Sequence, residues 1–425
     1  MTLIEDARKG RADEFVKLAA KNEGLDVEKL LRLIAKGYMV IPKNVLRDTI
    51  PKPIGMYAST KVNVNVGTSI DHVDLDEEKE KVKVAEKFGA DAIMDLSSGG
   101  NLDEIRRTLM KLTSLPFGTV PVYQAARDCK RVVDIREDEF FKVVEKQAKD
   151  GVDFMTIHAG VNKVSVERLK RSKRLLGVVS RGGAIIVGWM IHNDKENPYY
   201  ADFDYLLEIL KTYDVTISLG DAFRPGCLVD VDRVKLTEYV ILGELVDKCR
   251  EYGVQCMVEG PGHVPLDMIE TSVKAMKIAT ENAPLYLLGP LVTDAAAGYD
   301  HIAAAIGAAV AGMAGADFIC YVTPSEHLGL PTVEDVKEGV IAAKIAAHAA
   351  DLVKPGQREK AMERDLKMSL ARKKLDWKTQ FETSFDPEKA ESIWKRRRTS
   401  SEACSMCGDL CAIKLVESIF QTKEI

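Results

Sequence analysis

Nine short apolar runs rich in Val and Ile recur along the chain at intervals of roughly thirty residues, and each leads into a segment with helical periodicity. A strand followed by a helix at this spacing predicts parallel β/α units. Eight such units close a barrel of about 250 residues. We therefore predict an α/β protein with a (β/α)8 TIM-type barrel, in which one short run, either 177–180 or the last, is not a strand. The runs are Val62–Val66, Ala90–Leu96, Gly118–Tyr123, Phe154–His158, Gly177–Ser180, Val215–Leu219, Gln255–Glu259, Leu285–Leu288 and Phe318–Val322.

The segments that flank the barrel have a different character. Residues 1–55 are charged and helical in pattern, which predicts an N-terminal helical extension ahead of the barrel at 56–350. After residue 350 the strand rhythm stops, so residues 351–425 are predicted to form a C-terminal helical segment.

Polar side chains follow the predicted strands, at the point where each strand ends. In a β/α barrel the C-terminal ends of all strands face one mouth, where catalytic groups collect. Taken singly, each of these residues is an ordinary loop residue, but the series as a whole predicts one active site. Its members are Asn65, Met94, Tyr123, His158, Ser180–Gly183, Asp221–Arg224, Glu259, Tyr286 and Glu326–His327.

Two of these stretches indicate particular chemistry. Residues 180–183 form a small turn ahead of an apolar helix, whose backbone N–H groups suit phosphate, with Arg181 adding a bidentate contact. Many turns carry two glycines, so this pattern alone is weak. Asp221 and Glu259 are candidate acceptors for substrate hydroxyls or proton-transfer groups. Alternatively, they neutralise Arg224.

His263 and His327 occupy predicted loops after neighbouring strands. Imidazole is the commonest metal ligand. Two histidines plus substrate atoms or water would leave the open position that a catalytic zinc or iron needs. The alternative is that each histidine is a hydrogen-bonded structural residue.

Cys404, Cys407 and Cys411 place three of the eight cysteines within one short stretch. Thiolates suit iron–sulfur clusters and zinc. A closed structural zinc site takes four protein ligands, whereas a 4Fe–4S cluster on three cysteines keeps one iron open for S-adenosylmethionine (SAM). There are two alternatives: the cysteines form a zinc knuckle that a distant histidine completes, or they lie close together by chance. No histidine follows His348, which weakens the zinc interpretation.

Net charge and the distribution of apolar residues limit the kinds of molecule that the chain is expected to bind. A net charge of −5 gives no general attraction for nucleic acid or an anionic membrane. The first thirty residues hold no signal-peptide core, and the longest low-polarity stretch, Ile302–Ala316, is too short to cross a bilayer. We therefore expect a cytoplasmic protein without nucleic-acid or membrane partners. Its other cysteines are then reduced core thiols, namely Cys129, Cys227, Cys249, Cys256 and Cys320.

Seven motifs closely resemble the thiamine pyrimidine synthase family, which comprises the phosphomethylpyrimidine synthases and their 5-hydroxybenzimidazole synthase paralogs. The resemblance extends from about residue 55 to residue 414. The motifs are Lys61-Val-Asn-Val-Asn65, Met94-Asp-Leu-Ser97, Gly118-Thr-Val-Pro-Val-Tyr123, Ser180-Arg-Gly-Gly183, Glu259-Gly-Pro-Gly-His-Val-Pro265, Gly298-Tyr-Asp-His301 and Tyr321-Val-Thr-Pro-Ser-Glu-His-Leu-Gly-Leu330.

The resemblance implies a radical SAM enzyme that rearranges the carbon skeleton of 5-aminoimidazole ribotide, with a 4Fe–4S cluster on Cys404, Cys407 and Cys411. It also implies a zinc or iron ion on His263 and His327, an electron donor such as flavodoxin or ferredoxin, and a homodimer in which the cluster segment of one subunit caps the partner's barrel. The residues that it places against the ribotide are Asn65, Met94, Tyr123, His158, Ser180, Arg181, Gly182, Asp221, Ala222, Phe223, Arg224, Glu259 and Tyr286.

The chain departs from the synthase pattern at several positions. Ser59-Thr60 replaces Arg-Thr, Ala222-Phe223 replaces Gly-Leu or Gly-Met, and Ala295-Ala296-Ala297 replaces Ile-Ala-Pro. An Ala in place of Gly restricts the backbone beside a ligand-binding carboxylate, and loss of the Pro frees a loop. We read these changes as a reshaped pocket and expect 5-hydroxybenzimidazole, a cobamide lower-ligand precursor, as the product.

The alternative product is the thiamine precursor 4-amino-5-hydroxymethyl-2-methylpyrimidine phosphate. Two further alternatives come from other classes of protein. One is a zinc-dependent barrel hydrolase, and the other is a non-catalytic iron–sulfur protein.

Overall fold

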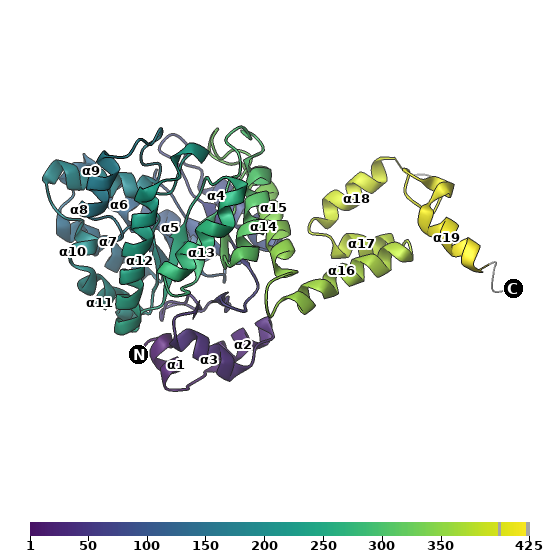
Figure 1. The fold of residues 1–425 in the computed structure, drawn as a ribbon, viewed down its shortest axis with the longest axis horizontal. Helices are drawn as coiled ribbons and strands as arrows, with labels where there is room; N and C mark the ends of the chain where they lie inside the picture. Colours follow the sequence, from purple (N-terminus) through teal and green to yellow (C-terminus); the bar gives the residue numbers. More distant parts are fainter. Residues whose placement is uncertain (398–400, 422–425) are drawn as a thin grey trace. The chain divides into compact units, whose positions relative to one another are not determined.

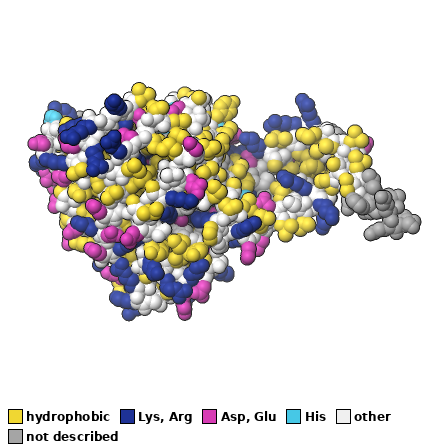
Figure 2. All heavy atoms as spheres, in the orientation of Figure 1, with side chains coloured by type: hydrophobic (Ala, Val, Ile, Leu, Met, Phe, Trp, Pro, Cys, Tyr) yellow, Lys and Arg dark blue, Asp and Glu magenta, His cyan; other side chains and the backbone are white. Residues whose placement is uncertain are grey.

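The computed structural model describes residues 1–397 and 401–421, which form two compact units, Met1–Gly356 and Gln357–Ile425 (Figure 1). Within the described residues, no helix has both the length and the apolar character needed to span a membrane. Basic and acidic side chains are interspersed on the visible face (Figure 2).

The first unit is a closed barrel of eight parallel strands in the order β10-β3-β4-β5-β6-β7-β8-β9, which confirms the predicted (β/α)8 fold. Its interior is filled by aromatic rings. The Phe154 and Phe318 ring centroids lie 6.3 Å apart, and a Cβ at Gly118 would come within 2.2 Å of the Phe154 ring. The strands are β3 (Lys61–Val66), β4 (Ala92–Asp95), β5 (Phe117–Thr119), β6 (Phe154–Ile157), β7 (Thr216–Leu219), β8 (Cys256–Gly260), β9 (Leu285–Leu288) and β10 (Phe318–Cys320).

Helices surround the barrel and connect its strands (Figure 1). Several begin at a side-chain cap, as at Asp74, Asn101 and Thr332. They are α4 (Leu75–Lys87), α5 (Leu102–Met110), α6 (Pro121–Asp128), α7 (Glu137–Asp150), α8 (Lys163–Lys170), α9 (Arg181–Asn193), α10 (Pro198–Ala201), α11 (Phe203–Tyr213), α12 (Arg233–Tyr252), α13 (Ile269–Ala279), α14 (Asp300–Ala314) and α15 (Val333–Asp351).

Of the two runs that we singled out, Gly177–Ser180 is the one that is not a strand, because Ser180 is the N-cap of α9 and its hydroxyl accepts the Gly183 N–H. One other run needs correction. The run at 118–123 ends early, because Pro121 occupies the first turn of α6 and fixes a helical φ there. Tyr123 therefore projects from a helix rather than from a strand end.

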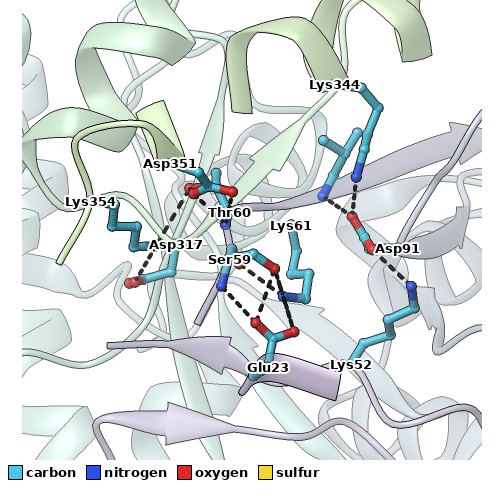
Figure 3. Close-up of polar contacts among 11 residues, drawn as sticks. Glu23, Lys52, Ser59, Thr60, Lys61, Asp91, Asp317, Lys344, Asp351 and Lys354 are labelled. Carbon is cyan, nitrogen blue, oxygen red and sulfur yellow. Dashed lines mark hydrogen bonds and ion pairs between the residues drawn. The ribbon is translucent and has the colours of Figure 1, made fainter. Parts of the chain in front are cut away.

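The N-terminal helices lie against the bottom of the barrel, where buried ion pairs join the elements (Figure 3). Lys61 at the start of β3 donates to Glu23 (2.7 Å) and to the Ser59 hydroxyl (2.6 Å). Asp351 accepts both the N–H and the hydroxyl of Thr60. The elements here are α1 (Leu3–Arg8), α2 (Glu14–Glu23), α3 (Val27–Ala35), β1 (Met39–Val40) and β2 (Ile54–Gly55).

The departure Ser59-Thr60 therefore lies at the bottom of the barrel, away from the strand ends that form the mouth. Ser59 and Thr60 form hydrogen bonds with Lys61 and Asp351 there, so this departure carries no information about the product. This corrects our reading of that substitution as part of a reshaped pocket.

The second unit is a small helical assembly. Its centre is a group of aromatic rings, in which Trp377 lies 6.3 Å from Phe381 and 5.6 Å from Trp394. The Trp377 indole N–H donates to the backbone oxygen of Glu402, close to the cysteine motif (Cys404, Cys407 and Cys411). The elements are α16 (Arg358–Lys373), α17 (Trp377–Thr383), α18 (Pro387–Arg396), the 3-10 turn η4 (Gly408–Leu410) and α19 (Ala412–Gln421).

Candidate active site at the barrel mouth

A cavity of about 80 Å³, the inner cavity, lies at the C-terminal ends of the strands. Eight of the thirteen residues predicted to contact substrate line it, so the structure brings these eight side chains together. They are Asn65, Met94, Tyr123, His158, Asp221, Arg224, Glu259 and Tyr286.

A larger cavity of about 370 Å³, the outer cavity, adjoins the first and shares Asn65 and Leu96 with it. Its wall includes Arg181, the segment 67–69, and six residues from the loop after β10, namely Tyr321, Thr323, Glu326, Gly329, Leu330 and Pro331. The Arg181 guanidinium lies 4.9 Å from the centroid of the Tyr123 ring, which lines the inner cavity. Arg181 therefore stands at the border between the two cavities.

A hydrogen-bonded group lies on the wall of the inner cavity. The Asn63 amide donates to Asn65 Oδ1 (2.8 Å) and to the Tyr286 hydroxyl (2.7 Å). The Asn65 amide donates in turn to Cys320 Sγ (3.0 Å). We predicted Cys320 as a core thiol; it is buried, but it also lines the cavity. Burial raises its pKa to about 12, so the thiol is neutral at physiological pH.

His158 is held between two glycines and a hydroxyl. Its Nε2 shares a hydrogen bond with Ser180 Oγ (3.0 Å). A Cβ at Gly182 would lie 2.2 Å from the ring, and one at Gly220 would lie 3.0 Å from it. Ser180 and Gly182 thus support His158 and do not line either cavity.

The electrostatic state of His158 follows from its surroundings. Burial, reinforced by the Arg224 and Lys235 charges, lowers the pKa of His158 to about 3. The imidazole is therefore neutral, and its Nδ1 is buried with no hydrogen-bond partner among the described residues. The His158 residue also lines the inner cavity.

Glu259 links two strand ends. Its carboxylate accepts from the Thr156 hydroxyl (2.8 Å) and from the Asp221 N–H (3.1 Å). Burial raises the pKa of Glu259, which Arg224 opposes. Arg224 donates to the backbone oxygen of Asp221 (3.3 Å).

The Asp221 carboxylate pairs with Lys235, a residue of α12. Burial lowers the pKa of Arg224, but the charges of Asp221 and Glu259 outweigh it and raise that pKa, as expected if the two carboxylates also neutralise Arg224. Burial raises the pKa of Asp221 above its usual range, while Lys235 opposes that shift. Its second oxygen, Oδ2, is buried and has no hydrogen-bond partner in the part of the chain that the structure describes.

Ala222 and Phe223, which we predicted to contact substrate, are fully buried and line neither cavity. Their backbone N–H groups donate to Glu238, also on α12. Side chains that point into the core reshape a ligand pocket only indirectly.

Sequence reasoning missed Thr156, Lys235 and Glu238. Thr156 was detectable, because it lies in β6 two positions before His158, which directly follows the strand, and alternate residues share a face. The two α12 residues gave no signal, since charged residues in the first turns of a long helix resemble a solvated face.

The structure brings His263 and His327 together, with ring centroids 5.2 Å apart. Each has a carboxylate at Nδ1: Asp294 lies 2.8 Å from His263, and Asp300 lies 3.2 Å from His327. A carboxylate on one ring nitrogen leaves the other to bind metal, as in many zinc sites. Among the described residues, however, no group of three or more His, Cys, Asp or Glu side chains has the arrangement of a metal site.

The cysteine motif folds as successive tight turns. The Gly408 N–H donates to the Cys404 oxygen (2.9 Å), and the Cys411 N–H donates to the Gly408 oxygen (3.3 Å). Gly408 adopts φ +52°, a conformation that favours glycine. All three thiols are free, and Cys407 is exposed. The number and type of these donors suit a cluster with three protein ligands, although the three thiols do not converge on one metal position in the described residues.

The barrel and its polar cavities define a TIM-barrel enzyme, and the cysteine motif adds ligands suited to an iron–sulfur cluster. The model of the Radical SAM ThiC family matches residues 2–418, and the chain belongs to that family. Radical SAM enzymes use a 4Fe–4S cluster and SAM, so family membership decides against a zinc-dependent hydrolase and against a non-catalytic iron–sulfur protein.

Curated relatives match over their whole length. The chain is 74% identical to the phosphomethylpyrimidine synthase of Archaeoglobus fulgidus, over 99% of this chain and 100% of that protein. It is 56% identical to phosphomethylpyrimidine synthase 1 of Methanosarcina mazei (100% and 99%) and 57% identical to the phosphomethylpyrimidine synthase of Methanocaldococcus jannaschii (99% and 99%). These names favour our alternative product, and the preferred reading as a 5-hydroxybenzimidazole synthase finds no support.

Proposed function

We propose that the chain is a phosphomethylpyrimidine synthase, which converts 5-aminoimidazole ribotide to 4-amino-5-hydroxymethyl-2-methylpyrimidine phosphate. The observation that carries the proposal is the full-length similarity to the Archaeoglobus fulgidus synthase. Ala222, Phe223 and the Ala295-Ala296-Ala297 stretch line neither cavity, so these substitutions give no support to a different product.

Cys404, Cys407 and Cys411 would hold the 4Fe–4S cluster, which supplies the electron that starts the radical chemistry of SAM. The barrel residues bind and orient the ribotide. His158 Nδ1 and Asp221 Oδ2 each offer a buried polar atom to its hydroxyl, amino or ring nitrogen groups. Arg181, at the border of the cavities, is placed to pair with its phosphate. The outer cavity then leaves room for a second ligand.

A second metal ion, zinc or iron, is also part of the proposal. His263 and His327 would bind it through Nε2, with Asp294 and Asp300 fixing the ring orientations. Because the protein supplies two ligands, the remaining positions would go to water or substrate atoms.

We further propose a cytoplasmic homodimer that receives electrons from a flavodoxin or ferredoxin. The dimer is supported by α14, whose outer face is apolar along its length, with Ile302, Ile306 and Met313 each about half exposed. Exposed apolar stripes of this kind are typical of protein–protein contacts.

The test is ribotide-dependent cleavage of SAM under anaerobic conditions. Reconstituted protein with SAM, a chemical reductant and 5-aminoimidazole ribotide should release 5′-deoxyadenosine and methionine. The Cys407→Ala variant should release neither, because the cluster lacks a ligand. SAM cleavage that does not depend on the ribotide would contradict the proposal.

A further inference from the structure

We infer that Lys235 and Glu238 on α12 are positioning residues for the substrate site, acting through Asp221 and the 221–223 loop. The identity of the ligand, a ribotide, rests on the proposed function. The two residues themselves lie outside every motif that carries the family resemblance.

A continuous series of hydrogen bonds connects helix α12 to the 221–223 loop beside the inner cavity. Lys235 Nζ donates to Asp221 Oδ1 and to Glu238 Oε2, the latter at 2.8 Å. Glu238 accepts the N–H groups of Ala222 (2.8 Å) and Phe223 (3.2 Å). The side chains of Lys235, Glu238 and Asp221 are each at most 3% exposed.

This arrangement leaves one carboxylate oxygen of Asp221, Oδ2, to accept a hydrogen bond from the ligand. Lys235 occupies Oδ1 of Asp221, so the carboxylate cannot rotate freely, and the unpartnered Oδ2 belongs to a residue that lines the inner cavity. An unpaired buried carboxylate oxygen is costly unless a donor reaches it. A hydroxyl or amino group of the ribotide is such a donor.

Glu238 adds a second effect, because it fixes the backbone of the loop. Both of its oxygens are used by loop N–H groups and by Lys235, so the loop cannot shift without breaking these bonds. Among the described residues, Lys235 is the only cation in a salt bridge with Asp221 or Glu238. Removing Lys235 would leave the buried Glu238 carboxylate without an ion-pair partner and Asp221 with only the more distant Arg224 charge.

The test measures binding of 5-aminoimidazole ribotide to the full-length protein by titration calorimetry, with thermal unfolding recorded for each variant. Lys235→Met should raise Kd at least tenfold, and Lys235→Arg should restore Kd to within about threefold, because the charge-assisted bond to Asp221 is retained. Lys248→Met is the matched control, since Lys248 lies on the same helix but is half exposed and pairs at 3.4 Å with Asp204. Its Kd should equal that of the native protein.

A double-mutant cycle separates positioning from a general structural role. Asp221→Asn should weaken binding, and adding Lys235→Met to it should cost no more than about threefold further, because Lys235 acts through Asp221. This comparison remains decisive if Lys235→Met alone does not fold. Unchanged Kd in Lys235→Met, or fully additive losses in the double variant, would overturn the inference. Failure of the native protein to bind the ribotide would instead overturn the proposed function, and this inference with it.

Discussion

Gly182→Ala should abolish efficient turnover while leaving the barrel folded. The added Cβ would lie 2.2 Å from Cε1, 2.5 Å from Nδ1 and 2.9 Å from Nε2 of His158. To reach an ordinary contact the ring must move by about 1 Å, and the ring is also close to the Gly220 backbone, where an added Cβ would lie 3.0 Å from it. Misplacement of a positioned group by about 1 Å costs on the order of 10²-fold in rate. Overpacking of a core position costs about 1–3 kcal/mol of stability.

The assay compares kcat/KM for the ribotide with the free energy of unfolding from urea titration. Gly188→Ala on the same helix is the control, because a Cβ there meets nothing within 4 Å. That variant should keep its activity and gain up to about 1 kcal/mol, since Ala is the better helix former. The reasoning would be refuted if Gly182→Ala kept kcat/KM within threefold of the native value.

Three further predictions follow from the site and its supports. Replacing any residue of the cysteine motif by Ala should remove the visible absorption of the reconstituted cluster, whereas Cys129→Ala should retain it; retention in a motif variant would argue against three-cysteine ligation. In a cluster-free background, His263→Ala and His327→Ala should each lose one equivalent of bound metal by elemental analysis, and unchanged metal content would reject that site. Burial alone would raise the pKa of Asp317, but its lysine partners hold it below the usual value, so Asp317→Asn should destabilise the barrel at pH 7. The penalty should shrink as the pH falls below about 4, where the unfolded carboxyl protonates first and the native one follows; a penalty independent of pH would show that the ion pairs contribute nothing.

Strand periodicity and strand-end polarity predicted the barrel and most of the inner cavity. Asn65, His158 and Glu259 lie where this reasoning put them, because parallel strands in a closed barrel must end at one mouth. The sequence did not decide whether Gly177–Ser180 or the last run was the extra one, since a capping Ser ahead of a helix can follow β-branched residues in a loop as well as in a strand.

The remaining part of the site depends on tertiary contacts that leave no local pattern. Lys235 lies fourteen positions beyond Asp221 and on a different element, so no spacing rule links the two. Ala222 and Phe223 sit beside a cavity-lining residue in the sequence, yet they face the core. Which side of a loop faces a ligand is decided by the helix packed behind it, here through Glu238.

Identification of the product by mass spectrometry tests the central claim most directly. Reconstituted protein, SAM, reductant and 5-aminoimidazole ribotide should yield 4-amino-5-hydroxymethyl-2-methylpyrimidine phosphate, which retains phosphorus. The Cys407→Ala variant should form none. Formation of 5-hydroxybenzimidazole, which contains no phosphorus, as the main product would contradict the assignment as a pyrimidine synthase.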